Sequence, residues 1–162
     1  MPLRDNYLTL SSAQSVLSTG STASNTPFDT GNMISSEYGQ SPYQTTNLNT
    51  VPQNLGQSVK KFFFQVRVNS GMSGGTAASY LTIALQSGAT SGAAGWVSVF
   101  SFGGAAVLTK PYLTAAANPL LLKIPLPEQP NYMKRYLKGL YTIGNVATAL
   151  TKFKLDAELI VY

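Results

Sequence analysis

The run TKFKLDAELIVY, residues 151–162, alternates between apolar and polar side chains and decides the fold class. Its apolar members are Phe153, Leu155, Ala157, Leu159 and Val161, and the residues between them include Lys152, Lys154, Asp156 and Glu158. Successive side chains of a strand point to opposite faces, so this period of two predicts a strand with one buried face. The run VKKFFFQVRV, residues 59–68, has the same period, with apolar side chains at even positions from 62 to 68.

Further runs outward from these two also predict strands, because they are short, apolar and bounded by turn residues. They are YLTIALQ (80–86), WVSVFSF (96–102), PLLLKIPLP (119–127) and RYLKGLYTI (135–143). The glycine-rich segment 69–75 predicts a turn. Residues 8–17 are compatible with a short helix, and no run has a long helical period. About eight short strands with long connections predict an all-β, jelly-roll-like antiparallel β-sandwich.

The composition changes near residue 57. Residues 1–57 are rich in Ser, Thr, Asn, Gln, Gly and Pro, yet they contain spaced large apolar residues and few charges. Disordered tails usually carry many charges. We therefore expect an extended N-terminal arm with long polar loops over 1–57, packed on the domain or on neighbouring subunits. Residues 58–162 are expected to form the β-sandwich, with a single domain overall, as suits 162 residues.

The composition argues against most catalytic chemistry. The chain has no cysteine and no histidine, which removes thiolate nucleophiles, the commonest general base and the commonest transition-metal ligand. Asp156 and Glu158 would lie about 7 Å apart on one strand face, a separation that resembles a glycosidase pair. Lysines flank them on a regular strand, however, so a solvated outer face explains them better. We expect no catalytic residue, no metal and no cofactor.

The net charge of +5 comes from scattered basic residues rather than from a concentrated stripe. Nucleic-acid binders usually concentrate their positive charge on one face. The glycines of residues 71–75 lack the Lys-Ser/Thr ending of a phosphate-binding loop. No run approaches the roughly 18 apolar residues of a membrane helix, and the start does not resemble a secretory signal. We expect synthesis in a host cytoplasm, with neither nucleic acid nor membrane as a partner.

Aromatic residues indicate possible contact surfaces. Tyr7, Tyr38 and Tyr43 suit an interface, because tyrosine offers a large area and a polar handle at low entropic cost. They could equally pack on their own sandwich. Phe63 would point outward between Lys61 and Gln65, and an outward Phe on a strand favours a covered surface.

Three segments resemble the jelly-roll structural cement (decoration) proteins of tailed-bacteriophage capsids. The opening segment is of the type D-x-x-x-x-L-S-x-A-Q, and a T-x-x-D-x-G-like turn falls within residues 21–31. A late stretch of the type P-x-x-x-x-R-Y-L-x-x-x-Y-x-x-G precedes the final strand. The matching residues are Asp5, Leu10, Ser11, Ala13 and Gln14 in the first segment, and Pro130, Arg135, Tyr136, Leu137, Tyr141 and Gly144 in the last. The insert at 32–57 departs from the family pattern.

The resemblance implies a virion protein that binds the outer surface of an assembled phage head. Such proteins bridge major capsid subunits and commonly act as homodimers or homotrimers. The implied partners are therefore the major capsid protein and the chain itself. The candidate capsid contacts are Arg4, Tyr7, Phe28, Tyr38 and Tyr43, and the candidate for self-association is Phe63.

Two other functions remain open from the sequence. A carbohydrate- or receptor-binding β-sandwich displayed on the virion could use Trp96 and surface tyrosines as stacking platforms. The chain could also be the main shell subunit of a small virus. The missing basic arm for genome neutralisation argues against this second alternative.

Overall fold

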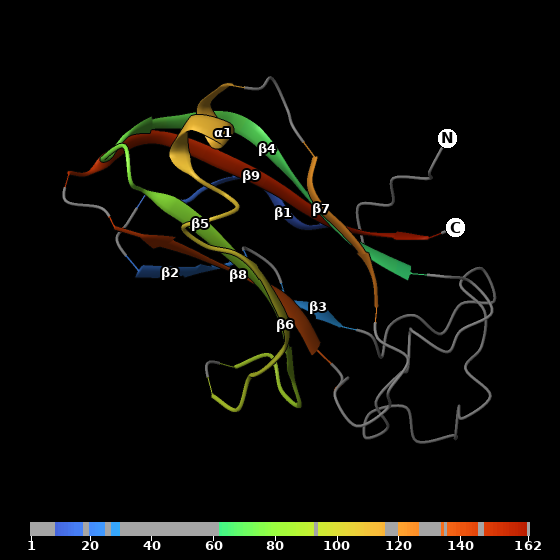
Figure 1. Cartoon of the computed structure of the whole chain (residues 1–162). Coiled ribbons are helices and arrows are strands. Elements are labelled where there is room, and N and C mark those ends of the chain that lie inside the picture. The colour runs from blue at the N-terminus through green and yellow to red at the C-terminus, as the bar shows by residue number, and fades with distance from the viewer. Residues whose placement is uncertain are drawn as a thin grey trace, which may run out of the picture.

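Two antiparallel sheets face each other in the computed structural model (Figure 1). It describes residues 9–17, 20–24, 27–29, 62–92, 94–115, 120–126, 134, 136–145 and 148–161. Sheet A has the strand order β1-β9-β4-β7, and sheet B has the order β2-β8-β5-β6 with β3 also paired to β8. The strands are β1 (Thr9–Ser15), β2 (Gly20–Ala23), β3 (Phe28–Asp29), β4 (Phe62–Gly74), β5 (Tyr80–Gly88), β6 (Val97–Gly103), β7 (Leu120–Pro125), β8 (Tyr136–Gly144) and β9 (Leu150–Val161).

The strand order is that of a jelly roll. Strand β1 pairs with β9, β2 with β8, β4 with β7 and β5 with β6, all antiparallel. The chain therefore follows one long antiparallel ribbon that is rolled into two sheets, as in other double-sheet jelly rolls. The predicted all-β, jelly-roll-like sandwich is confirmed.

The six strands predicted after residue 57 are present as β4 to β9, and two local expectations were wrong. The segment 69–75 does not turn, because β4 continues to Gly74 by pairing with β9 through several register shifts. Residues 9–15 form a strand and not a helix, because they lie along β9 at the edge of sheet A.

Part of the predicted N-terminal arm belongs to the sandwich itself. Strand β1 lies at the edge of sheet A, while β2 and β3 pair with β8 in sheet B. The compositional change near residue 57 therefore does not separate an arm from the domain. Residues 1–8, 18–19, 25–26 and 30–57 of the predicted arm lie outside the described residues.

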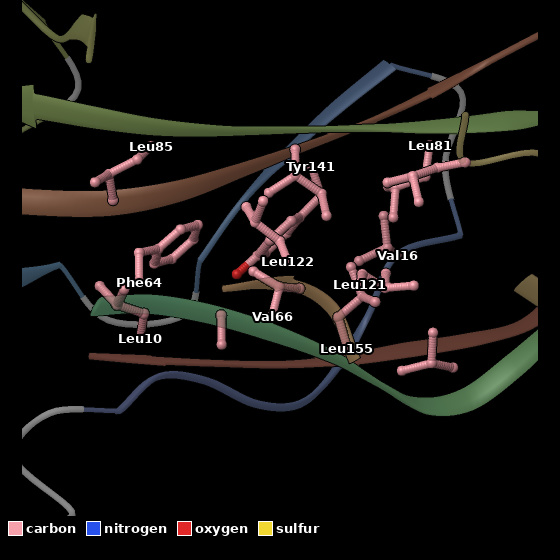
Figure 2. Close-up of a cluster of buried hydrophobic side chains, with 14 of the residues drawn as sticks. Leu10, Val16, Phe64, Val66, Leu81, Leu85, Leu121, Leu122, Tyr141 and Leu155 are labelled. Atoms are coloured by element: carbon pink, nitrogen blue, oxygen red, sulfur yellow. The ribbon is translucent and has the colours of Figure 1, made fainter. Parts of the chain in front are cut away.

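The core lies between the two sheets. Figure 2 shows Phe64 and Val66 of β4 pointing toward Leu85 of β5 and Tyr141 of β8. The ring of Phe64 also meets Phe100 of β6 edge-on, with the ring centroids 5.8 Å apart. Alternate residues of β9 are buried, as its period of two predicts.

A short helix, α1 (Lys110–Ala115), packs on β4 (Figure 1). Its Leu113 is buried, and Thr114 Oγ1 donates to the carbonyl oxygen of Met72 at 2.9 Å. A Cβ at Gly71 would lie 3.3 Å from the carbonyl oxygen of Leu113, so glycine permits this close approach. The sequence did not reveal α1, because six residues are too few to show a helical period.

Candidate interaction surface

A buried polar network fastens β1 to sheet B. The Ser11 and Tyr141 hydroxyl oxygens lie 2.9 Å apart, and Ser11 Oγ donates to Gln14 Oε1 at 2.5 Å. The Gln14 side-chain amide donates in turn to the carbonyl oxygen of Ala23 on β2. Burial raises the pKa of Tyr141 well above its ordinary value, and the nearby Asp156 charge adds to this. These polar groups therefore hold the two sheets together.

The network includes residues that carry the family resemblance. Ser11 and Gln14 come from the opening segment, and Leu10 beside them is in the core. Ala13 adopts a positive φ of 45°, and its N–H donates to Asp156 Oδ1 at 2.6 Å. Tyr141 comes from the late segment. These motif residues support the fold and do not form a contact surface.

The two carboxylates of β9 lie on the outer face of sheet A and accept hydrogen bonds across the sheet. Asp156 Oδ2 accepts from Asn69 Nδ2, and Glu158 Oε1 accepts from Gln65 Nε2, both at 3.0 Å. Their partners lie on the neighbouring strand β4, where Gln65 is directly opposite Glu158. The arrangement fits cross-strand pairing better than an acid/base pair.

The described part of the chain lacks two kinds of functional feature. Within it, no group of three or more His, Cys, Asp or Glu side chains is placed to hold a metal ion. None of its helices is long and apolar enough to span a membrane.

Two of the predicted contact residues can be placed. Phe28 of β3 pairs with Leu137 and is only 7% exposed, because it faces the core at the end of sheet B. We therefore remove Phe28 from the set of surface contacts. Phe63 lies on the outer face of sheet A and is partly exposed, with Lys123 Nζ 5.3 Å from its ring centroid. Arg4, Tyr7, Tyr38 and Tyr43 lie outside the described residues.

Four connections meet at one end of the sandwich, which we call the α1 end (Figure 1). Their described residues are 16–17, 75–79, 104–115, 145 and 148–149, and the antiparallel order of both sheets brings these together. Thr76 Oγ1 and Ser79 Oγ donate to the carbonyl oxygen of Asn145 at 2.8 and 3.1 Å. The Lys110 N–H donates to the carbonyl oxygen of Ser79 at 2.9 Å. Three of the four connections are thus tied to one another.

The α1 end exposes large apolar side chains. Val107 is 49% exposed and Tyr112 46%, and Leu17 is exposed as well. Elsewhere in the described chain a similar exposure is found for Leu120 of β7, which pairs with Arg67 part-way along β4, and for Val97, which lies at the opposite end. The four connections contain a single charged residue, Lys110, and no carboxylate. This end combines apolar surface with almost no charge, which favours contact with another protein.

The sequence did not reveal the α1 end because its members are far apart along the chain. Leu17, Val107 and Tyr112 share no period and no motif. The sequence feature that could have revealed this end is the near absence of charged residues from its connections, since connections normally lie at the surface in water.

The outer face of sheet B is also nearly neutral. Ser21 and Thr142 share a hydrogen bond at 2.7 Å, and Ala84 is almost fully covered by its neighbours. Lys138 lies on this face with its Nζ 4.2 Å from the centroid of the Trp96 ring, and burial lowers its pKa. The other contacts of Trp96 are with Gly88, which it covers, and with the Gly92 carbonyl, to which its Nε1 donates at 2.5 Å.

Comparison with known proteins does not assign a family. No family model matches the chain, and no curated protein sequence is significantly similar to it.

Proposed function

We propose that the chain is a capsid decoration protein that binds the outside of an assembled phage head and stabilises it. The observation that carries this proposal is the α1 end, where exposed Val107 and Tyr112 lie on tied connections that are almost free of charge. Single exposed apolar residues are ordinary on a protein surface. Several at one end of a rigid sandwich favour a surface that another protein covers.

The hydrogen bonds within the α1 end favour docking without rearrangement. Association costs free energy for every loop that must be ordered. Here Asn145, Ser79 and Lys110 already join the β4–β5 turn, the β8–β9 turn and the start of α1. A surface ordered in advance loses less conformational entropy when it binds.

The proposed mechanism is preferential binding to the assembled shell. A copy that touches two or more major capsid subunits binds the lattice more tightly than it binds one free subunit. Binding the assembled state more tightly shifts the equilibrium toward intact particles. Self-association would add further links between subunits. Arg4, Tyr7, Tyr38 and Tyr43 stay predictions for additional contacts, and the virion stays the proposed location.

The carbohydrate-binding alternative lacks comparable support. Its strongest candidate, Trp96, lies over Gly88 and has the Lys138 ammonium group over its ring. A sugar stacking on this ring would compete with contacts that the residue already makes.

A binding experiment tests the proposal. Particles of the virus that encodes the chain, prepared without its gene, would be mixed with the purified chain and sedimented. We expect the wild-type chain to sediment with particles and the double variant Val107→Ser/Tyr112→Ser to bind at least about tenfold more weakly, which corresponds to about 1.4 kcal/mol.

Val97→Ser is the matched control, because Val97 is 47% exposed but lies at the opposite end. It should bind as the wild type does. No sedimentation of the wild-type chain would refute the proposed function. Equal weakening by the control and the double variant would refute the role of the α1 end.

A further inference from the structure

The described sandwich has four edges, one of them shared by β2 and β3, and these edges differ in how they are protected. Edge strands expose unpaired N–H and C=O groups, and proteins commonly shield them with short length, lysine, proline or bulges. Strand β7 carries Lys123 and Pro125, and β2 has only four residues. Strand β1 is broken by register shifts around Ala13, which has a positive φ. Each of these three edges therefore has an evident protection.

The fourth edge, β6, has the least protection. Its sequence VSVFSFG contains no charged residue and no proline. One register shift interrupts its pairing with β5 near Val99, and the pairing is then regular from Phe100 to Gly103. Among the described residues, β5 pairs with one side of β6, and no described strand pairs with the other side of β6. The stretch from Phe100 to Gly103 is an open template for another strand.

The backbone of Ser101 faces that open side. The Gly104 N–H donates to the carbonyl oxygen of Leu81 at 2.8 Å, which fixes the alternation of the antiparallel ladder. By this alternation Phe102 directs its N–H and C=O groups toward β5, and Ser101 directs its own away from β5. The outward side chains beside Ser101 are the small, neutral Thr82 and Ala84 of β5. Neither side-chain bulk nor charge obstructs an incoming strand there.

We propose that β6 pairs antiparallel with β6 of a second copy of this chain, around a two-fold axis beside Ser101. When β6 of one copy runs antiparallel to β6 of the other, each outward N–H group faces an outward C=O group of the partner strand. Each chain has a net charge of +5, but β6 contains no charged residue. The seam therefore brings no like-charged β6 side chains of the two copies together. A two-fold contact of this kind closes with two copies. The protected edges of β1, β2 and β7 would oppose further growth of the sheets.

This pairing is a site of self-association separate from Phe63, which lies on the outer face of sheet A and stays a prediction. It rests on the self-association included in the proposed function, but it is tested on the free protein. A monomeric chain that still binds particles would overturn the pairing alone. A β6-paired dimer that does not bind particles would overturn the proposed function alone.

Light scattering on the full chain is the first test. We expect the wild type to have twice the 17.2 kDa chain mass. In Ser101→Pro we expect a dissociation constant at least about tenfold higher, since proline removes an outward N–H while sparing the β5 ladder. A monomeric or trimeric wild type would overturn the pairing, and so would a folded Ser101→Pro variant with unchanged dimerisation.

Cysteine cross-linking is the second test, and it does not depend on the proline variant folding. The chain has no cysteine, so a single Ser101→Cys variant can form a disulfide only with another copy. Facing residues at an antiparallel seam lie about 5 Å apart, within disulfide range. Ser21→Cys on β2, the opposite edge of sheet B, is the control. We expect rapid covalent dimers from Ser101→Cys only, and equal rates from both variants would overturn the pairing.

Discussion

Ser11 is a single buried hydroxyl on β1 that joins two buried side chains. It lies 2.9 Å from the hydroxyl of Tyr141 on β8 and donates to Gln14 at 2.5 Å. Buried polar groups cost free energy when they lack a hydrogen-bond partner. At the residue scale, the attachment of the N-terminal strand to sheet B therefore depends on this hydroxyl.

Replacing Ser11 with alanine leaves the buried Tyr141 hydroxyl without this partner. We expect the free energy of unfolding to fall by about 1–3 kcal/mol, measured by urea denaturation. The neighbouring exposed residue gives a matched control, and Ser12→Ala should change the value by less than about 0.5 kcal/mol. Similar losses for the two variants would show that the network does not fasten β1.

Tyr141 also predicts a dependence of stability on pH. Burial raises its pKa above the ordinary 10.0, with a contribution from Asp156, while the Ser11 hydrogen bond acts in the opposite direction. Below pH 10 both folded and unfolded states keep the proton, and stability is unaffected. Above it the unfolded state loses the proton first, so the free energy of unfolding should fall by up to about 1.4 kcal/mol per pH unit.

The variant Tyr141→Phe isolates this effect, because lysines also titrate in the same range. Denaturation curves at about pH 9 and about pH 11 should show a smaller decline in the variant than in the wild type. Identical declines would mean that Tyr141 ionises as freely in the folded chain as in the unfolded one.

At the element scale, the sequence predicts those strands that bury one face along the whole length of the strand. Alternation in β9 and β4 revealed both strands, since every second side chain enters the core. The continuation of β4 to Gly74 was not predictable, because small residues there are held by pairing with β9. In β1 two register shifts break the alternation, one between Thr9 and Ser11 and one around Ala13, and Leu10 and the adjacent Ser11 are both buried.

A glycine pairing between β5 and β8 gives an element-scale prediction. Gly144 lies opposite Tyr80, and a Cβ there would be 2.1 Å from Tyr80 Cζ. Gly144→Ala should lower the free energy of unfolding by about 1–3 kcal/mol, because the ring must move. In a Tyr80→Ala background the same substitution should cost almost nothing, as a double-mutant cycle by denaturation would measure. An equal cost in both backgrounds would contradict the clash.

At the scale of the whole molecule, the fold was predictable and the candidate surface was not. The period-two runs and their turns indicate a sandwich, and the pairing of the described strands makes it a jelly roll. We predicted contact residues from side-chain type alone, which does not distinguish a buried position from an exposed one. Phe28 was therefore included although it is buried in the core. Leu17, Val107 and Tyr112 come to the same end of the sandwich only after both sheets form.

The central claim is that the chain stabilises an assembled shell through its α1 end. The most direct measurement is the temperature at which particles release their DNA, compared between particles with and without the chain. We expect particles without the chain to release their DNA at a lower temperature. Adding the wild-type chain or Val97→Ser should restore the higher release temperature, whereas adding Val107→Ser/Tyr112→Ser should not. Equal release temperatures with and without the bound chain would contradict it.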